Sequence, residues 1–389
     1  MRVGIDGRYI QNHFPGIGRY TYNLVRALAL VSPQDTFIVF YNPRLENTRF
    51  DIQRLAAPNV LLRLADVPTF SMQEQTKLPS LITKEKVAVF HSPYYIKPYR
   101  HRVPSVVTIH DVSPSLYPEY LPSVQARLVF EATTRLAIAT SKVVIVDSYA
   151  ARTDLIREYS VSPDKVRVVH LAADEFEDGQ GRSELPSCLQ GRRYVLYLGI
   201  NKPHKNLVRL IQAWAKIDVP HKLVLAGKED ERYPEARQEV EALGLAGRVM
   251  FLGEVKEDEM PAVYRGAELF VFPSLYEGFG LPVLEAMKSG VPVIASQTSS
   301  LPEIVGDAGI LVNPYDVNEM AMAIQFTLTN DSLREELRQK SLDQAQKFSW
   351  ERTARETLQI YREAASGDDA GSSRLQGLLS SFGWHREPH

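Results

Sequence analysis

The segment 269–296 constrains the fold of this chain more than any other. It begins with the apolar run Leu269–Phe272, which is short enough to be a buried strand, and it continues through a glycine-containing turn. Pro282 suits the start of a helix, where its missing N–H costs nothing, and the spacing predicts that this helix spans residues 283–289. The segment therefore predicts a strand that passes through a tight turn directly into a helix.

The next part of the segment completes a βαβ unit. Gly290 can end the helix, and an apolar run over residues 291–295 predicts a second strand. A glycine-bearing loop at a helix N-terminus can hold an anion, because backbone N–H groups and the helix dipole both favour negative charge there. Two carboxylates, Glu277 and Glu285, flank this predicted anion site. A ligand bound here must therefore present other groups besides phosphate.

Length and composition limit the class of protein. A chain of 389 residues is too long for one ordinary core, so two domains are expected. The net charge of -2 gives no reason to expect a nucleic-acid partner. The single cysteine, Cys188, excludes an internal disulfide and is interpreted as an incidental thiol in a reducing compartment. No secretory leader or membrane-length apolar run is found, so we expect a cytoplasmic protein.

Alternating strand-like and helix-like runs predict an α/β fold with two doubly wound, parallel-stranded halves. In the first half, strands are predicted over residues 2–6, 36–41, 60–64, 87–91, 105–109, 142–147 and 166–171. In the second half, they are predicted over residues 195–198, 222–226, 249–252, 269–272, 291–295 and 310–312. Turn-prone residues between the halves predict the domain boundaries. These are an N-terminal domain 1–172, a linker 173–192, a C-terminal domain 193–348, a helix 349–365 that returns to the first domain, and a tail 366–389.

Polar residues at predicted strand ends are candidates for a site, because ligands bind at the carboxyl ends of strands in open α/β sheets. After the first strand, a loop over residues 7–18 contains Gly16 and Gly18, which is consistent with a ligand loop or with a plain tight turn. His91 ends another strand and is interpreted as a satisfied, partly buried side chain. His110 is more suggestive, because an aspartate and a loop rich in Pro, Ser and Tyr follow it.

The segment 277–285, EGFGLPVLE, resembles the E-x7-E motif of retaining glycosyltransferases of family 4 (GT4), which have the GT-B fold. Further segments are similar to the same family and follow in the same order. They are PGIGRY near the start, Thr108 to Asp111, the loop from Gly199 to Asn206, FLGEV at 251–255 and FSWERTA at 348–354. The resemblance implies two Rossmann-like domains that face a cleft, with a nucleotide-diphosphate sugar bound by the second domain.

The resemblance also implies roles for residues of the second domain. The backbone N–H groups of Phe279, Gly280 and Leu281 would meet the distal phosphate and the sugar. Lys205 would pair with the diphosphate and offset the charge that builds on it as the sugar leaves. Glu277 would hold the sugar hydroxyls.

The resemblance also implies residues that contact the nucleoside and a second cation, besides Lys205, that pairs with the diphosphate. Glu285, expected in the first helical turn, would accept hydrogen bonds from the ribose. Val255 would present its backbone to the base. Many relatives add an arginine early in the 199–206 loop, where this chain has Ile200 and Asn201. Lys202 is the candidate to replace that arginine.

From the first domain, Gly16 and Gly18 would close over the diphosphate or the sugar through bare backbone. His110 would lie beside the sugar, hydrogen-bond a hydroxyl and steady the positive charge that develops on the ring. No bound cofactor is expected. No two aspartates are spaced i, i+2, so the usual metal anchor of the other glycosyltransferase fold is missing. This pattern favours catalysis without a bound metal.

The donor and the acceptor stay open. The version of the motif resembles mannosyltransferases and favours mannose from GDP-mannose, while a UDP-sugar such as UDP-glucose is the alternative. The acceptor, a glycan or lipid-linked glycan, should contact regions 71–75, 91–95 and 111–120. A lipid-linked acceptor would require peripheral contact with the inner membrane face. A basic cluster, Lys97 with Arg100, His101 and Arg102, is interpreted as a solvated loop instead.

Three other classes of protein share some of these sequence features. A nicotinamide-dependent oxidoreductase would need G-x-G-x-x-G after the first strand, but Thr21 stands where the third glycine belongs. A sugar-phosphate epimerase or a phosphorylase of the same two-domain fold is closer, and the phosphorylase would need a pyridoxal lysine. A non-catalytic nucleotide-sugar-binding partner subunit is disfavoured by intact His110, Lys205, Glu277 and Glu285.

Overall fold

The computed structural model describes residues 1–121, 123–174 and 184–366. The chain divides into two compact units. Unit 1 contains Met1–Leu171 together with helix α13 (Trp350–Ser366), and unit 2 contains Ala172–Ser349. Residues 175–183 of the expected linker and 367–389 of the expected tail lie outside the described residues.

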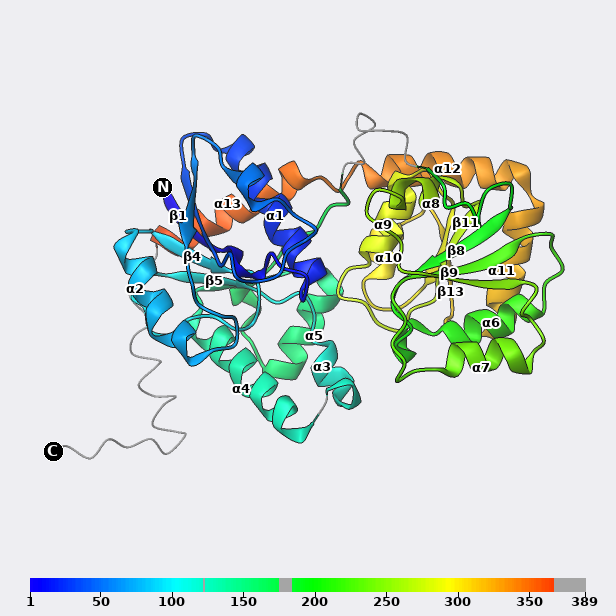
Figure 1. The fold of residues 1–389 in the computed structure, drawn as a ribbon, viewed down its shortest axis with the longest axis horizontal. Coiled ribbons are helices and arrows are strands. Elements are labelled where there is room, and N and C mark those ends of the chain that lie inside the picture. Colours follow the sequence, from blue (N-terminus) through cyan, green and yellow to red (C-terminus); the bar gives the residue numbers. More distant parts are fainter. Residues whose placement is uncertain (122, 175–183, 367–389) are drawn as a thin grey trace. The chain divides into compact units, whose positions relative to one another are not determined.

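Unit 1 is built on a seven-stranded sheet in the order β3-β2-β1-β4-β5-β6-β7 (Figure 1). Its strands are β1 (Arg2–Asp6), β2 (Thr36–Tyr41), β3 (Val60–Leu64), β4 (Val89–Ser92), β5 (Ser105–Thr108), β6 (Val143–Val146) and β7 (Val166–Val168). Every pairing between these strands is parallel, and Val3 of β1 lies opposite Phe37 of β2 and Val89 of β4. The order reverses between β1 and β4, which is where open α/β sheets bind ligands.

Helices connect the strands of unit 1. They are α1 (Pro15–Val31), α2 (Lys77–Lys84), α3 (Ser113–Leu116), α4 (Val124–Thr140) and α5 (Tyr149–Tyr159), with 3-10 turns η1 (Gly7–Tyr9), η2 (Ile52–Leu55), η3 (Met72–Gln75), η4 (Pro118–Tyr120) and η5 (Pro163–Lys165). Serine caps begin two of them: Ser123 Oγ accepts from Ala126 N–H at 3.1 Å, and Ser148 Oγ accepts from Ala151 N–H at 3.0 Å. Such caps satisfy N–H groups that lack a helical partner.

The expected glycine loop over residues 7–18 is wrong. The chain forms η1 and then starts α1 at Pro15, so Gly16 and Gly18 lie in the first turn of that helix. Gly18 N–H already donates to Phe14 O at 2.7 Å. A Cβ on Gly18 would lie 3.1 Å from Tyr9 O, so the glycine is required for close packing.

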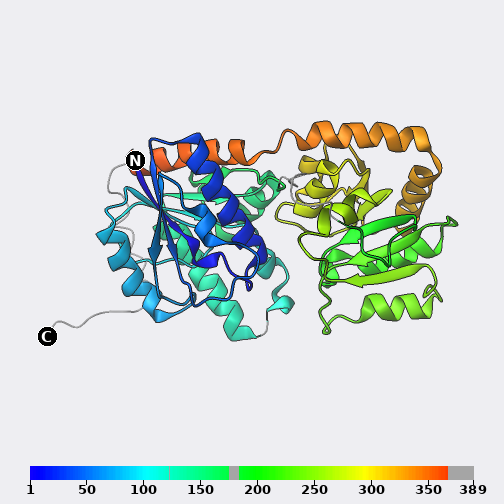
Figure 2. The same cartoon turned by 45° about the horizontal axis from the view of Figure 1, so that its top comes forward.

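Helix α13 packs beside α1 in unit 1, as Figure 2 shows for the orange-red and blue helices. The ring of Trp350 lies 6.4 Å from that of Tyr20 in α1. Thr353 Oγ1 donates to His170 O at 2.7 Å, and the buried Tyr361 reaches the sheet. Helix α13, the last helix of the described residues, thereby completes the packing of the first unit.

Unit 2 has a six-stranded parallel sheet in the order β10-β9-β8-β11-β12-β13. Its strands are β8 (Tyr194–Leu198), β9 (Lys222–Ala226), β10 (Val249–Gly253), β11 (Leu269–Phe272), β12 (Val293–Ser296) and β13 (Ile310–Val312). Its helices are α6 (Leu207–Ala215), α7 (Glu235–Ala242), α8 (Met260–Arg265), α9 (Leu281–Lys288), α10 (Leu301–Val305), α11 (Val317–Thr329) and α12 (Asp331–Ala345), with the turn η6 (Pro203–Lys205). The two parallel, doubly wound sheets confirm the predicted fold class.

Central strands explain why the apolar runs of the sequence are continuous rather than alternating. All four residues of β11 are at most 1% exposed, because helices cover both faces of a parallel sheet. Each such large side chain contributes about 1.5–3 kcal/mol on burial. The order of unit 2 reverses between β8 and β11, so the loops after these two strands lie side by side at the ligand-binding edge.

Candidate active site

Lys205 and Glu277 meet at the edge of unit 2 where the strand order reverses. Lys205 ends η6 after β8, and Glu277 lies in the loop after β11. Lys205 Nζ donates to Glu277 Oε1 at 2.6 Å, and the two side chains are 15% and 12% exposed. The ammonium also lies 5.7 Å from the centre of the Phe272 ring. The structure therefore brings two predicted site residues into one accessible ion pair.

The loop that carries Glu277 is held by its neighbours. Ser299 Oγ donates to Glu277 O at 2.6 Å, and Ser300 Oγ donates to Phe279 O at 2.6 Å. Asn206, in a left-handed conformation with φ 63°, donates from Nδ2 to Pro273 O at 3.1 Å and to Pro314 O at 2.7 Å. Rigid support of this kind keeps a binding side chain in place before a ligand arrives.

Helix α9 begins directly after this loop. Gly280 precedes it with φ 109°, a value that favours glycine, and an added Cβ would lie 2.8 Å from Leu301 Cδ2. The helix starts at Leu281, two residues earlier than predicted, with Pro282 in its first turn. The first-turn N–H groups of a helix lack intrahelical partners, so this end of α9 can receive an anion. Phe279 itself is buried, with 4% exposure.

Glu285 occupies a different place from the expected one. Because α9 starts at Leu281, Glu285 lies in the second turn of the helix and not in the first. It is 5% exposed, and its Oε2 accepts from the hydroxyl of Tyr264 at 2.7 Å. Tyr264 is itself fully buried in α8. The carboxylate is thus anchored inside unit 2, and its contact with a ribose stays a prediction.

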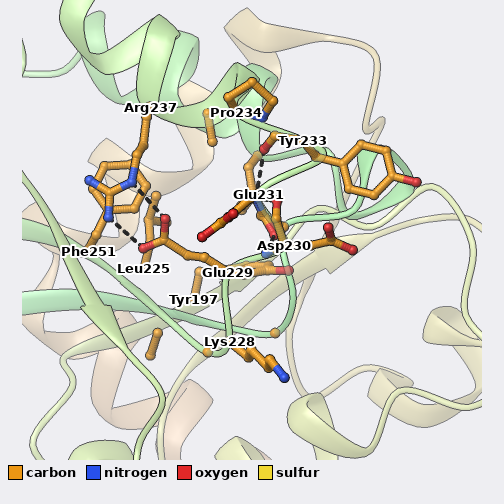
Figure 3. Close-up of a pocket in the computed structure, with 16 residues that line it drawn as sticks. Tyr197, Leu225, Lys228, Glu229, Asp230, Glu231, Tyr233, Pro234, Arg237 and Phe251 are labelled. Carbon is orange, nitrogen blue, oxygen red and sulfur yellow. Dashed lines mark hydrogen bonds and ion pairs between the residues drawn. The ribbon is translucent and has the colours of Figure 1, made fainter.

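A cavity of about 390 Å³ opens at the ends of β8, β9 and β10 (Figure 3). Arg237 lines it, pairs with Glu229 at 2.6 and 2.7 Å, and places its guanidinium 4.2 Å from the centre of the Phe251 ring. Gly199 and Gly227 also line it, and a Cβ on Gly227 would lie 2.3 Å from Gly199 O. Sequence reasoning missed this cavity, although a glycine directly after a predicted strand was a usable signal.

The residues expected near the base and the second phosphate lie beside this region without lining the cavity. Val255 follows β10 by two residues and is 9% exposed, and Lys202 precedes η6. Asn201 stands where relatives were expected to have an arginine. Its Nδ2 donates to Asp230 O at 3.0 Å and to Tyr233 O at 2.7 Å, and its Oδ1 accepts from Asp230 N–H at 2.6 Å. Asn201 therefore ties two loops of the site together.

In unit 1, His110 forms a pair with Asp147 that sequence reasoning missed. His110 follows β5 and Asp147 follows the neighbouring strand β6. His110 Nδ1 lies 2.7 Å from Asp147 Oδ2, and Nε2 lies 3.1 Å from Pro93 O. Both ring nitrogens face acceptors, which suits an imidazolium. The sequence did contain one indication of this pair, because His110 and Asp147 lie at the ends of two consecutive predicted strands.

The electrostatics of His110 follow from these neighbours. Burial lowers the pKa of His110, but the charge of Asp147, its hydrogen bond and the charge of Asp111 raise it, and the pKa ends above its ordinary value. The ring edge of Tyr20 packs against it at 4.9 Å. The role expected for His110 beside the sugar stays a prediction.

The interpretation of His91 as a side chain with satisfied hydrogen bonds is confirmed, although the residue is fully buried and not partly buried as expected. Its Nδ1 lies 2.6 Å from Tyr361 Oη and its Nε2 lies 2.8 Å from Thr108 Oγ1. Burial, with a smaller effect of His110, lowers its pKa to about 3. This histidine links α13 to the sheet and stays neutral.

The expected solvated basic loop is wrong for Lys97. Its side chain is 1% exposed and donates to Ser105 Oγ. Burial, assisted by the charge of Lys165, lowers its pKa to about 7. The sequence showed four basic residues close together, but packing against β5 removes this one from the surface.

Comparison with known proteins assigns the family. The family described as Glycosyltransferase Family 4 matches residues 15–175, and the one described as Glycosyl transferases group 1 matches residues 188–344. O-antigen chain mannosyltransferase B of Escherichia coli is 31% identical over 382 residues, which cover 93% of this chain and 100% of that protein. Serotype-specific mannosyltransferase WbdA of the same organism is 33% identical over 224 residues, 54% of this chain and 27% of WbdA.

Solved structures agree on the fold. Anabaena HepE in complex with UDP-glucose superposes with a TM-score of 0.71 at 20% identity, over 93% of this chain and 99% of HepE. The fold and the matches together define a glycosyltransferase. This chain belongs to glycosyltransferase family 4 and has the GT-B fold.

The helices of the described residues include none that is both long and apolar enough to cross a membrane.

Proposed function

We propose that this glycosyltransferase transfers mannose from GDP-mannose to a hydroxyl of a glycan or lipid-linked glycan, with retention at the anomeric carbon. The family supports the transfer of a sugar. Mannose is favoured because two relatives above 30% identity carry the name mannosyltransferase. The UDP-glucose complex of HepE supports a UDP-sugar as the second candidate donor.

The ion pair of Lys205 and Glu277 carries the proposal. It lies at the ligand-binding edge of unit 2, beside the N-terminus of α9. An incoming diphosphate is a stronger partner for the ammonium than one carboxylate, so Lys205 turns to the phosphate and releases Glu277 to the sugar hydroxyls. The ammonium and the helix N-terminus then stabilise the charge that grows on the leaving diphosphate. With Lys202 as a second cation, these groups need no bound metal.

The nucleoside has a matching space in the same unit. The cavity of about 390 Å³ lies in the size range of small-ligand pockets. Gly199 lines it and also begins the loop that leads to Lys205, so a ligand can occupy both places at once. We assign the nucleoside to this cavity and its border, with Val255, which lies just outside the lining, beside the base. Glu285, also outside the lining, is kept as the candidate partner of the ribose.

His110 is assigned to the sugar. Its N–H on Nε2, which donates to Pro93 O, can be redirected to a sugar hydroxyl while Asp147 holds the other side of the ring. Gly16, exposed in the first turn of α1, is the remaining candidate for a backbone contact with the diphosphate. The departing phosphate accepts the proton of the acceptor hydroxyl, so the reaction requires no separate protein base.

A panel of GDP-, UDP- and ADP-sugars in thermal unfolding tests the donor. A ligand at 100 times its Kd stabilises the native state by about 2.7 kcal/mol. We expect GDP-mannose to raise the melting temperature most and to support transfer. A larger shift with UDP-glucose would replace the donor assignment, and transfer from no nucleotide sugar would refute the proposed function.

Glu277→Gln provides the matched test of the site. We expect this variant to keep its fold and lose hexose transfer, because the amide can neither pair with Lys205 as a charge nor bind the sugar as strongly. Glu335→Gln is the control, since that carboxylate is 78% exposed on α12. Wild-type transfer by Glu277→Gln would contradict the assignment.

A further inference from the structure

Three aromatic rings gather at the ligand-binding edge of unit 1. Phe14 precedes α1, Phe70 follows β3 and Tyr94 follows β4. The ring centres are 5.6 Å apart for Phe14 and Phe70, 5.6 Å for Phe14 and Tyr94, and 6.2 Å for Phe70 and Tyr94. Tyr9, fully buried, packs at 5.4 Å against both Phe14 and Tyr94. These three rings, here called the aromatic platform, therefore rest on the core.

The most exposed ring of the platform is held in a strained conformation. Phe70 is 49% exposed and has φ 58°, a left-handed value that a non-glycine residue rarely adopts. Its backbone N–H donates to Glu74 Oε2 at 3.1 Å. Strain of this kind persists only where the surroundings impose it, and it concentrates at functional sites.

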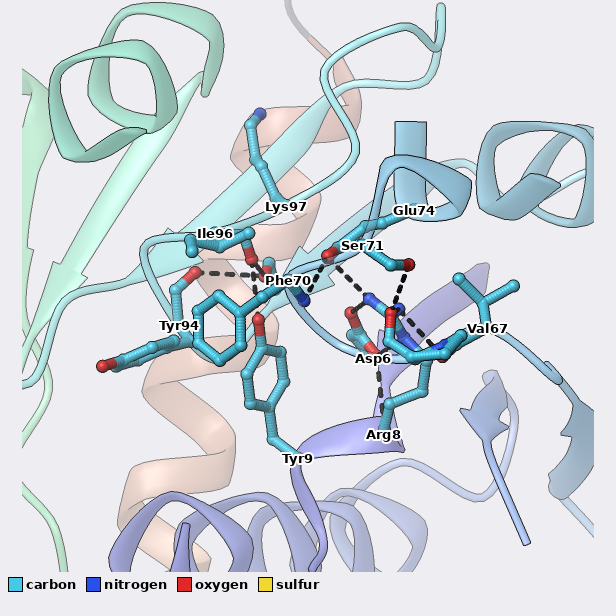
Figure 4. A network of polar contacts seen from close by, with 12 residues as sticks. Asp6, Arg8, Tyr9, Val67, Phe70, Ser71, Glu74, Tyr94, Ile96 and Lys97 are labelled. Carbon is cyan, nitrogen blue, oxygen red and sulfur yellow. Dashed lines mark hydrogen bonds and ion pairs between the residues drawn. The ribbon is translucent and has the colours of Figure 1, made fainter. Parts of the chain in front are cut away.

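A buried ionic network imposes that conformation (Figure 4). Arg8 donates to Asp6 at 2.8 and 2.6 Å and to Glu74 at 2.7 Å, and all three side chains are at most 1% exposed. The guanidinium also reaches Val67 O at 3.3 Å and Pro68 O at 3.4 Å. The network thus holds the loop that carries Phe70 at two places, at Val67–Pro68 and at the N–H of Phe70. Its charged side chains are buried, so none of them is available to a ligand.

The platform lies next to His110, the residue of unit 1 that is assigned to the sugar. Tyr94 directly follows Pro93, whose carbonyl faces His110 at 3.1 Å. A rigid aromatic platform that lies next to that histidine, and whose outermost ring, Phe70, is half-exposed, suits the apolar C–H face of a pyranose ring, which stacks on aromatic rings. We propose that Phe14, Phe70 and Tyr94 form the acceptor subsite and bind a pyranose of the acceptor by stacking; the proposal rests on the proposed function.

Saturation-transfer NMR on the full chain, without donor, tests the subsite directly. The probes are the methyl α-pyranosides of mannose, glucose and galactose. We expect transfer to the ring C–H protons of at least one probe, retained in Phe70→Tyr and lost in Phe70→Ala. Leu30→Ala is the control, because Leu30 is 82% exposed near the end of α1 that lies opposite Phe14. No signal for any probe with the wild type, or an equal signal in Phe70→Ala, would overturn the subsite.

Kinetics separate the subsite from the proposed function. Phe70→Ala should raise KM for the bound pyranoside about tenfold, equivalent to about 1.4 kcal/mol, and leave KM for the nucleotide sugar unchanged. If the wild type binds the pyranoside but transfers no hexose, the proposed function fails while the binding site stands. If Phe70→Ala instead loses sedimentation with phosphatidylglycerol vesicles and keeps pyranoside binding, the platform is a membrane contact and the subsite is refuted.

Discussion

Removing Glu74 should destabilise unit 1, because it takes away one of the two carboxylates that pair with a buried guanidinium. The side chain of Arg8 is 0% exposed and pairs with Asp6 and with Glu74, so Asp6 still neutralises it when Glu74 is removed. The lost hydrogen bond to a charged group costs about 1.5–3 kcal/mol. The N–H of Phe70 also loses its acceptor, which adds about 1 kcal/mol. We therefore expect Glu74→Ala to lower the free energy of unfolding by about 2.5–4 kcal/mol.

Calorimetry and urea denaturation measure this loss. For a unit of this size, the melting temperature should fall by roughly 5–15 °C. Glu119→Ala is the control, since Glu119 is an exposed acid of the same unit and should change stability by less than about 0.5 kcal/mol. Adding Arg8→Met to Glu74→Ala should deepen the loss, because Asp6 then stays buried without its cationic partner. A loss below about 1 kcal/mol for Glu74→Ala, or a double variant as stable as Glu74→Ala, would refute the reasoning.

Three further predictions concern pH and metal. Asp147→Asn should move the alkaline limb of the pH–rate profile for transfer to lower pH, because the Asp147 carboxylate raises the pKa of His110 against the effect of burial. The other groups that face the His110 ring, Asp111, Tyr20 and His91, are unchanged in this variant. An unmoved alkaline limb would contradict the prediction. Hydrogen bonding from Arg193, opposed by burial, lowers the pKa of Glu268 from 4.5 to about 2. The stability that this carboxylate contributes is present above pH 4.5 and lost as pH falls to about 2, so the deficit of Glu268→Gln in urea denaturation should shrink over that range; a constant deficit would count against it. EDTA should leave transfer unchanged, and a loss that Mn²⁺ restores would exclude the metal-independent mechanism.

Local sequence patterns predicted the bounds of several strands correctly, because the run of apolar side chains alone indicates such a strand. The runs Arg2–Asp6, Thr36–Tyr41 and Lys222–Ala226 are strands with the predicted bounds. Helix starts were less predictable, because they depend on single backbone conformations. The left-handed φ of Gly280 begins α9 two residues early and moves Glu285 into the second turn.

The candidate site was predictable as a set of residues but not as a geometry. Lys205 and Glu277 are 72 residues apart, and only the pairing of β8 with β11 brings their loops together. Asp147 was missed for the same reason, because its contact with His110 depends on β6 lying beside β5. Strand order is a property of the whole sheet, so no local pattern contains it.

The sequence by itself determined the α/β class, the turn before α9 and the chemistry available there, since periodicity, glycines and residue types are local properties. The tertiary structure alone decided which charges are accessible. Arg8 and Lys97 are cations that the fold buries, whereas Lys205 lies at an accessible edge beside Glu277. Burial and partnership depend on residues distant in the chain, and they decide whether a charged side chain supports the fold or is available to a ligand.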